Sequence, residues 1–336
     1  MMIETFELGP FTVPRLWTGL WQLSSNAWGT APAPKIRREM ARHVDLGYIA
    51  FDMADHYGSA EILFGQFQKS FPPGRKVVGA TKWCVFRPTY PSRQTVEAAV
   101  RERIHRMGTR SVDLLQFHWQ DYANRDYITA LRHLQDLQHE GLITALGLCN
   151  FDSIRTDEIC TQLGPRAIVS NQVQFSLIDT RPLHGMASVC EKHGIKLLTY
   201  GTLCGGFLSD TWLHKPEPDL YAGSLTPSQR KYLDIILHAW GTWDLFQSLL
   251  TTLRTIADRH RASIANIATR WVLDHPFVGA VLVGSRLGVS EHTADNHHVF
   301  TFTLSPADTA SIEALLARSN SRRMITTIGD CGAEYR

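Results

Sequence analysis

Residues 92–118 read SRQTVEAAVRERIHRMGTRSVDLLQFH, and this stretch contains one complete unit of a helix followed by a strand. Ser92 is a residue type that caps the N-terminus of a helix. Behind it, apolar residues recur at helical spacing, namely Val96, Val100, Ile104 and Met107. Gly108 then ends the pattern, as a glycine in the left-handed conformation commonly does, and residues 112–117 have the length and pattern of a strand. The stretch therefore predicts a helix that returns directly to a buried strand.

The same order of helix, glycine and strand recurs along most of the chain. The glycines that separate a helical pattern from an apolar run include Gly47, Gly141, Gly164 and Gly194. We expect strands near 17–21, 48–52, 76–81, 112–118, 143–148, 167–172, 195–200 and 278–283. Helices that alternate with strands across short turns imply parallel strands, in a doubly wound sheet or a closed barrel. Eight such units favour the α/β class and, within it, the (β/α)8 TIM barrel.

The chain has 336 residues, whereas such a barrel typically takes about 250, and two segments account for the excess. Residues 5–13 have the pattern of an N-terminal β-hairpin, which we expect to close the bottom of the barrel. The segment 201–261 is too long for one turn, and we expect it to form a long loop after strand seven, with a flap over the barrel mouth and then helical turns. Because no low-complexity linker divides the chain, we predict a single domain over 1–336.

Composition and charge exclude several classes of protein. The sequence is 44% hydrophobic and 20% charged, as in globular proteins with a large core. Its formal net charge of +2 lacks the clustered excess of basic residues that nucleic acids or membrane surfaces attract. The six cysteines form no C-x-x-C motif, and the first residues include Glu4 and Glu7 rather than the basic residues of a signal peptide. We expect a cytoplasmic protein with no nucleic-acid or membrane partner, and its oligomeric state is open.

Polar residues follow nearly every expected strand. In chain order they are Asp52, Lys82, His118, Asn150, Gln172, Tyr200 and the run Gly284-Ser285-Arg286. In a (β/α)8 barrel the active site lies at this end of the strands. Taken singly, each has an ordinary structural explanation, such as a helix cap for Asp52 or a solvated side chain for Lys82. Their joint occurrence favours a catalytic barrel mouth.

Tyr57, five residues after Asp52, suggests which chemistry this mouth performs. A tyrosine titrates near pH ~10 and is a weak acid at neutral pH unless a cation favours its phenolate. Lys82 can be that cation, held in place by Asp52, while His118 can donate a hydrogen bond to a carbonyl oxygen. Such a site protonates an oxyanion, which is half of a carbonyl reduction. The hydride must come from a nicotinamide cofactor, because no side chain supplies one.

Over residues 5–318 the chain resembles the aldo-keto reductases, a family of NAD(P)H-dependent oxidoreductases built on the (β/α)8 barrel. The motifs are specific: Asp-x-x-x-x-Tyr after strand two, Lys after strand three and His after strand four. The resemblance implies a catalytic tetrad of Asp52, Tyr57, Lys82 and His118. It also implies reduction of an aldehyde or ketone to an alcohol, or the reverse reaction, on a small-molecule substrate.

The resemblance further implies where the cofactor would bind. Asn150 and Gln172 would hold the nicotinamide carboxamide, and Tyr200 would stack on the nicotinamide ring. The residues implied along the pyrophosphate are Gly201, Thr202, Leu203 and Gly205, and those for the adenosine part are Gly284, Ser285, Arg286, His292 and Asn296. The chain departs from the family at Cys149, where a serine is usual, and at Thr202-Leu203 in place of Ser-Pro.

Arg286 decides which cofactor we expect. It lies in the last loop before a helix start at Ser290-Glu291, and backbone N–H groups there, together with a forked guanidinium, suit an anion such as a 2′-phosphate. NADP(H) is therefore preferred, with NAD(H) as the second choice. The competing interpretation of Arg286 is a surface salt bridge to Glu291 or Asp295.

Aromatic residues near the strand ends predict an apolar wall for the substrate. We expect Trp21, at the end of strand one, and Trp119, after His118, to line the pocket. Trp28 and Tyr90 serve equally well as packing for the rim. The resemblance also implies that the tail, 319–336, can reach the pocket, so the roles of Cys331 and Tyr335 stay open.

Three other functions compete with a reductase. A cofactor-binding regulatory subunit could retain the tetrad and turn over very slowly. A divalent metal site at Asp52, Asp55, His56 and His118 is disfavoured by the charge of Lys82, and we expect no metal. Glycoside hydrolysis needs two facing carboxylates, and only Asp52 is well placed.

Overall fold

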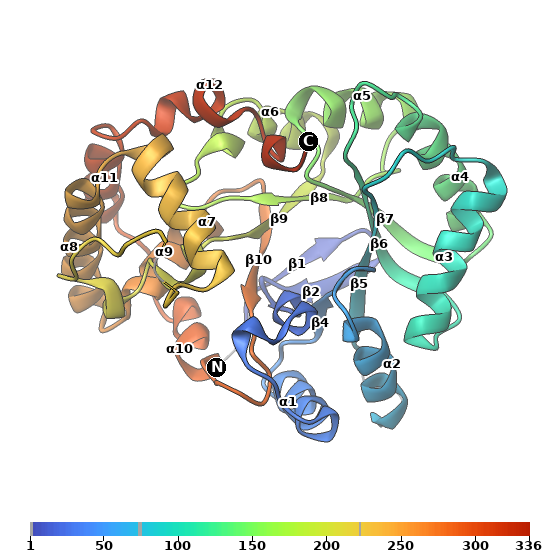
Figure 1. The fold of residues 1–336 in the computed structure, drawn as a ribbon, viewed down its shortest axis with the longest axis horizontal. Coiled ribbons are helices and arrows are strands. Elements are labelled where there is room, and N and C mark those ends of the chain that lie inside the picture. Colours follow the sequence, from blue (N-terminus) through green and yellow to red (C-terminus); the bar gives the residue numbers. More distant parts are fainter. Residues whose placement is uncertain (1–2, 73–75, 222) are drawn as a thin grey trace.

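The computed structural model describes residues 3–72, 76–221 and 223–336. In this part of the chain, eight parallel strands form a closed barrel in the order β10-β3-β4-β5-β6-β7-β8-β9 (Figure 1). Their bounds are β3 (Leu16–Gly19), β4 (Ala50–Asp52), β5 (Val78–Val85), β6 (Val112–Trp119), β7 (Ile143–Cys149), β8 (Ser170–Gln174), β9 (Lys196–Tyr200) and β10 (Val278–Gly284). Each overlaps an expected strand, and the predicted (β/α)8 fold is confirmed.

The predicted N-terminal hairpin is present and seals one end of the barrel. β1 (Thr5–Leu8) pairs antiparallel with β2 (Phe11–Pro14). Leu8 and Val13 pack with inward-facing barrel residues in one apolar cluster. The hairpin approaches the barrel so closely that a Cβ on Gly279 of β10 would lie 2.3 Å from a ring carbon of Phe6. With this end closed and the interior filled by apolar side chains, the opposite rim, where the strands terminate, is the end that can bind a ligand.

Helices surround the barrel on the outside (Figure 1). Those that follow the strands are α1 (Ala33–Asp45), α2 (Ala60–Ser70), α3 (Arg93–Met107), α4 (Tyr127–His139), α5 (Ser153–Leu163), α6 (Met186–His193), α8 (Trp243–His260), α9 (Ile264–Leu273), α10 (Thr293–His297) and α11 (Pro306–Leu316). The caps of α3 agree with the sequence: Ser92 Oγ accepts from the backbone N–H of Thr95 at 3.2 Å, and Gly108 is left-handed with φ 60°. The described residues include no helix long and apolar enough to cross a membrane.

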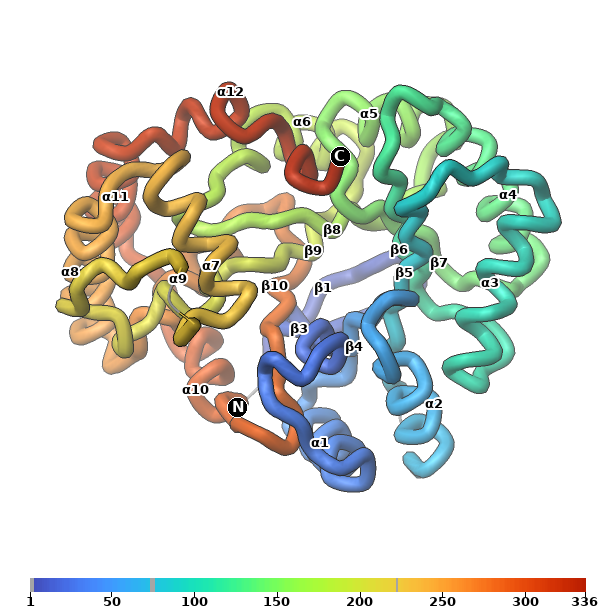
Figure 2. Tube along the Cα trace, in the orientation of Figure 1, coloured from blue at the N-terminus to red at the C-terminus, as the bar shows by residue number. Residues whose placement is uncertain are grey.

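The long segment after β9 folds into short helical elements. It contains 3-10 turns at Cys204–Gly206 and Asp210–Trp212, then α7 (Pro227–Asp234) and a π-helical turn (Ile235–Trp240) that leads to α8. The tube in Figure 2 shows that this segment stays on one side of the barrel. α7 packs on the first of these turns. The predicted helical turns are therefore present, and they cover the loop that leaves β9.

Strand periodicity decides which side chains reach the barrel interior. On β6, Gln116 and His118 alternate with Phe117 and Trp119, and successive side chains of a strand point to opposite faces. Phe117 and Trp119 belong to the apolar core between the strands and the helices. Trp119 is 3% exposed, and its indole N–H donates to the backbone oxygens of Asp121 and Asn124 at 2.6 and 3.0 Å. The structure therefore does not place Trp119 in the pocket, contrary to the expectation from its position after His118.

Candidate active site

A buried ion pair lies at the mouth of the barrel. Lys82 Nζ on β5 lies 2.7 and 2.9 Å from the two carboxylate oxygens of Asp52, at the end of β4, and also donates to Met53 O at 2.8 Å. Both side chains are at most 5% exposed. Burial by itself would lower the pKa of Lys82, but the charge of Asp52 outweighs it and leaves this pKa raised. Lys82 is therefore a fixed cation.

Tyr57 faces this cation from the first turn after β4. Its Oη lies 3.5 Å from Lys82 Nζ, and the ammonium is 4.8 Å from the centre of the phenol ring. Burial raises the pKa of Tyr57 well above its usual value, while the charge of Lys82 works in the opposite direction. The phenol therefore carries its proton at neutral pH, beside a group that would stabilise the phenolate once that proton has left.

Two glutamines complete the shell of Asp52. Gln116 Nε2 and Gln172 Nε2 donate to Asp52 Oδ1 at 2.9 and 2.7 Å, and Gln116 Oε1 accepts from Gln172 Nε2 at 2.8 Å. The sequence singled out Gln172 but not Gln116. The signal for Gln116 was a polar residue two positions before His118, and therefore on the same face of the strand.

His118 is buried among aromatic rings at the same mouth. Its ring lies edge-on to Phe86 and Tyr335, with centroids 5.5 and 5.9 Å away. Burial first of all, and then the neighbouring His56, Lys82 and Arg336, lower the pKa of His118 to about 4. At neutral pH His118 is thus an uncharged imidazole, which carries one N–H as a donor.

The low pKa of His118 predicts an acid-dependent loss of stability. Between its unfolded value of 6.5 and its folded value of about 4, the unfolded chain binds more protons, so the free energy of unfolding falls as the pH falls. From pH 7 to pH 5 this group alone contributes a loss of about 2 kcal/mol. We expect the stability difference between wild type and His118→Gln, measured by urea unfolding at the two pH values, to shrink by that amount. A difference that does not change with pH would contradict the lowered pKa of His118.

Asn150, Tyr200 and the tail meet next to His118. Tyr200 Oη donates to Asn150 Oδ1 at 2.9 Å and lies 3.3 Å from Tyr335 Oη, to which Lys231 Nζ donates at 2.8 Å. Asn150 has a positive φ of 59°. The tail packs closely against Asn150 at Gly332, where an added Cβ would lie 2.1 Å from Asn150 O.

Ion pairs hold the tail in this position. α12 (Met324–Ile328) leads into residues 330–336, which turn inward from the rim beside β8 (red in Figure 1). Arg181 pairs with Glu334 at 2.9 Å, and Asp330 Oδ2 accepts from the backbone and the hydroxyl of Ser153. Arg336 Nη2 donates to Asn150 O at 3.0 Å. The tail therefore reaches the mouth, as the resemblance implied.

The residues expected along the pyrophosphate form the turn after β9. Thr202 is buried, with its hydroxyl on Phe175 O at 3.0 Å, whereas Gly205 is exposed. Leu203 is partly buried. A Cβ on Gly201 would lie 2.3 Å from Tyr232 Oη of α7, while nothing lies within 4 Å of a Cβ on Gly206. This turn is thus packed on the side of α7 and open beside Gly206.

The residues expected at the adenosine end lie on the rim after β10. Ser285 N–H donates to Gly19 O at 3.0 Å, and a Cβ on Gly284 would meet Gln22 Nε2 at 2.2 Å. His292 is exposed and Asn296 is partly buried, with the backbone N–H of Asn296 on His292 O at 2.8 Å.

Arg286 is exposed and carries a charge without a carboxylate partner among the described residues. Its Nε donates to Ser290 Oγ at 3.1 Å. Glu291 was one expected salt-bridge partner of Arg286, but its carboxylate lies instead 3.5 Å from Arg42 and 3.8 Å from His43. The other candidate, Asp295, accepts from Ser263 Oγ at 3.1 Å. The guanidinium is therefore available to an anion.

Of the two tryptophans expected in the pocket, only Trp21 lies at the rim. It follows β3, is 38% exposed and contacts the ring of Trp28 at a centroid distance of 4.7 Å. Trp28 itself is buried, and Tyr90 is 80% exposed.

One group of side chains in the described part of the chain has the spacing of metal ligands. Donor atoms of Asp55, His56 and Cys84 lie within 4.8 Å of one another. Asp55 is already satisfied, by His56 Nδ1 at 3.0 Å and by the backbone N–H of Cys84 at 2.8 Å, and Arg103 lies 3.7 Å from it. In this structure the Asp55 carboxylate is therefore engaged in hydrogen bonds and lies beside the cation of Arg103.

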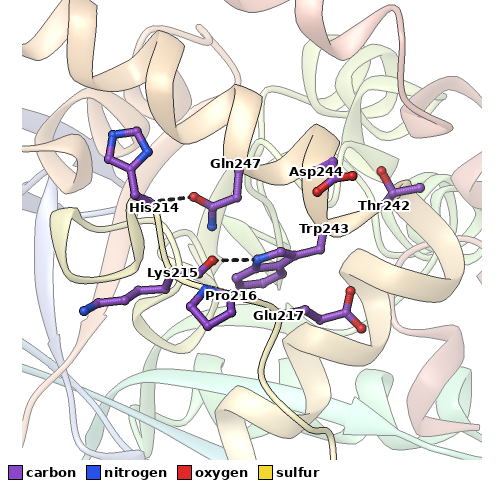
Figure 3. Close-up of a pocket in the computed structure, with 8 residues that line it drawn as sticks. All are labelled: His214, Lys215, Pro216, Glu217, Thr242, Trp243, Asp244 and Gln247. Atoms are coloured by element: carbon purple, nitrogen blue, oxygen red, sulfur yellow. Dashed lines mark hydrogen bonds between the residues drawn. The ribbon is translucent and has the colours of Figure 1, made fainter.

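A hollow of about 560 Å³ lies away from the barrel mouth, between residues 214–217 and the first turn of α8 (Figure 3). Trp243 Nε1 donates to Lys215 O at 2.9 Å across it, and Gln247 Oε1 accepts from the backbone N–H of His214. None of the residues expected to bind cofactor or substrate lines it.

The chain belongs to the aldo/keto reductase family, whose family model matches residues 15–317. It is 25% identical to the chloroplastic pyridoxal reductase of Arabidopsis thaliana over 97% of this chain and 89% of that protein. It is 24% identical to the aldo-keto reductase YhdN of Bacillus subtilis, over 91% of each. Among solved structures, the glycerol dehydrogenase of Gluconobacter oxydans shares the fold, with a TM-score of 0.74 and 24% identity over 94% of this chain and 95% of that one. As a member of this family, the protein is an NAD(P)H-dependent oxidoreductase of carbonyl compounds.

Proposed function

We propose that this chain, as one barrel domain over 1–336, is an NADP(H)-preferring reductase that converts an aldehyde or ketone to an alcohol, or runs the reverse reaction. The observation that carries the proposal is the contact of Tyr57 Oη with Lys82 Nζ at 3.5 Å, together with the ion pair of Lys82 and Asp52. A phenol beside a fixed cation is an acid that can protonate an alkoxide oxygen.

The donor set at the inner end of the mouth fits the nicotinamide. Tyr200 occupies Asn150 Oδ1, so the amide of Asn150 offers its N–H groups to a ligand. We propose that Asn150 and Gln172 hold the carboxamide and that Tyr200 lies against the ring. The turn of Gly201, Thr202, Leu203 and Gly205 would follow the pyrophosphate, supported by the open space beside Gly206. When bound, the cofactor supplies the hydride.

The side chains then divide the remaining work. His118, neutral and buried, donates its N–H to the carbonyl oxygen and orients it. Tyr57 gives its proton to that oxygen as negative charge develops there, and Lys82 stabilises the resulting phenolate. Asp52 keeps Lys82 charged and in place.

The substrate side favours a flat carbonyl compound. The rings of Phe86 and Tyr335 lie against His118, and Trp21 is exposed at the rim. Aromatic rings bind planar apolar groups well. The relative from Arabidopsis thaliana is named for pyridoxal, an aromatic aldehyde. We therefore propose an aromatic aldehyde as the first substrate class to test.

The adenosine end supports the preference for NADP(H). We propose that Gly284, Ser285, Arg286, His292 and Asn296 bind this part of the cofactor. Arg286 is exposed and forms no ion pair with the described carboxylates, which suits a 2′-phosphate. We further propose a cytoplasmic location, since the six cysteines are all free thiols.

We expect Arg286→Ala to weaken NADPH binding about tenfold or more and NADH binding less than twofold, because a charge-assisted hydrogen bond contributes about 1.5–3 kcal/mol. Isothermal titration calorimetry with each cofactor measures this. Arg42→Ala is the matched control, because it removes a neighbouring arginine that is paired with Glu291. Equal losses for NADPH and NADH would show that Arg286 does not meet the 2′-phosphate.

The alternative function is a cofactor-binding regulatory subunit with little turnover. Rapid kinetics distinguish it from a reductase. NADPH bound to the enzyme is mixed with a simple aromatic aldehyde, and oxidation is followed by absorbance in one turnover and at steady state. A reductase shows rapid oxidation followed by sustained turnover. A regulatory subunit shows one slow turnover, and that result would overturn the proposed function.

A further inference from the structure

Gln116 lies in the centre of the site without reaching the solvent. It is 0% exposed, so it cannot itself touch a cofactor or a substrate. Its Nε2 donates to Asp52 Oδ1 at 2.9 Å, and its Oε1 accepts from Gln172 Nε2 at 2.8 Å. It therefore links the ion pair of Lys82 and Asp52 to the amide that we propose for the nicotinamide.

The chemistry of these three groups leaves one orientation for the Gln172 amide. A carboxylate only accepts hydrogen bonds, so Gln172 must turn its NH2 toward Asp52, which it meets at 2.7 Å. The second N–H of the same nitrogen goes to Gln116 Oε1. Because an amide nitrogen has two N–H groups, both are used, and only Oε1 of Gln172 is left for a ligand.

This orientation complements that of Asn150. Tyr200 occupies Asn150 Oδ1, which leaves the N–H groups of Asn150, while Gln172 offers an oxygen. A carboxamide has one acceptor oxygen and one NH2 donor, so a donor on one side and an acceptor on the other match it. If Gln172 turned over, its NH2 would face the NH2 of the carboxamide.

We propose that Gln116 is a positioning residue that fixes the Gln172 amide so that Gln172 Oε1 accepts from the carboxamide N–H. The inference rests on the proposed function, in which Asn150 and Gln172 hold the nicotinamide. Without the acceptor on Gln116, one N–H of Gln172 is buried without a partner. Asp52 still holds the other N–H, so the amide pivots about that hydrogen bond toward a new acceptor, and Gln172 Oε1 loses its direction toward the ligand.

Three ligands separate this role from a general structural one. Isothermal titration calorimetry measures the Kd of wild type and Q116M for NADPH, for the analogue with an acetyl group in place of the carboxamide, and for 2′-phospho-ADP-ribose. The acetyl group lacks the N–H, and the third ligand lacks the nicotinamide. We expect the Kd of NADPH to rise about tenfold and the other two to stay within about twofold. Gln135→Met is the matched control, because it removes a partly buried glutamine whose Nε2 donates to Leu163 O, away from the mouth.

Equal losses for all three ligands would show that Gln116 only supports the fold, and an unchanged Kd for NADPH would show that it does not orient Gln172. Either result overturns the inference and leaves the proposed function standing. Wild type that binds no NADPH would overturn both. In a double-mutant cycle, adding Q116M to Q172M is expected to cost no further NADPH affinity, and an additive loss would also contradict the inference. If Q116M does not fold, Q116N is the substitute variant. Its side chain is one methylene shorter, which moves the amide oxygen away from Gln172 Nε2, and we expect the same pattern of Kd values.

Discussion

Replacing Tyr57 by phenylalanine is expected to lower kcat for carbonyl reduction about 1,000-fold while the Kd for NADPH stays within about twofold of wild type. The variant keeps the ring that contacts Lys82 and removes only the hydroxyl, 3.5 Å from Lys82 Nζ. The hydroxyl is the proton donor in the proposed mechanism. Steady-state kinetics with an aromatic aldehyde and calorimetric titration with NADPH measure the two quantities.

The control for this prediction is Tyr127→Phe. Tyr127 is also buried, but its hydroxyl donates to Glu158 Oε2 at 2.7 Å on the outside of the barrel. We expect this variant to lose some stability and to keep its kcat. If Tyr57→Phe retained wild-type turnover, Tyr57 would not be the general acid.

Replacing Lys82 by methionine is expected to abolish turnover and to lower the free energy of unfolding by about 3–5 kcal/mol, because it leaves a buried carboxylate without its counter-ion. Asp52 is 3% exposed and, among the side chains that the structure describes, would keep the amide donors of Gln116 and Gln172. Urea unfolding at pH 7 measures the stability, and steady-state kinetics measure the turnover.

The double variant Asp52→Asn/Lys82→Met separates stability from catalysis. Neutralising both partners removes the uncompensated charge, so we expect most of the lost stability to return. Turnover should not return, since the cation beside Tyr57 is still missing. A Lys82→Met variant as stable as wild type would mean that the ion pair is not buried as described, and a double variant with normal turnover would exclude Lys82 from the mechanism.

The sequence predicted the barrel because its signals are local. Ser92 and Gly108 mark the ends of α3 within 20 residues, and both caps are present. Such marks, repeated between helices and strands, report the order of elements, and a parallel (β/α)8 barrel follows from that order. Polar residues at strand ends then indicated Asp52, Lys82 and His118 as one group, since all strands of a barrel end on the same rim.

Trp119 shows how a local signal was misread. It follows His118 directly, so both residues come at the end of the same strand, which lies at the barrel mouth. On a strand, however, neighbours face opposite sides, so an inward His118 sends Trp119 toward the helices. The alternation was present in the sequence and would have excluded Trp119 from the pocket.

The sequence alone determined the order of strands and helices, the polar residues at the strand ends and the family to which the chain belongs, because each of these depends on spacing along the chain. Only the tertiary structure decided which side chains are hydrogen-bond partners in the site. Gln116 and Gln172 meet Asp52 across 64 and 120 residues, and Tyr335 meets Tyr200 across 135. A hydrogen bond requires atoms to lie within about 3 Å. That proximity is set by the register of neighbouring strands, which places Lys82 opposite Gln116, and by the packing of the tail on the rim.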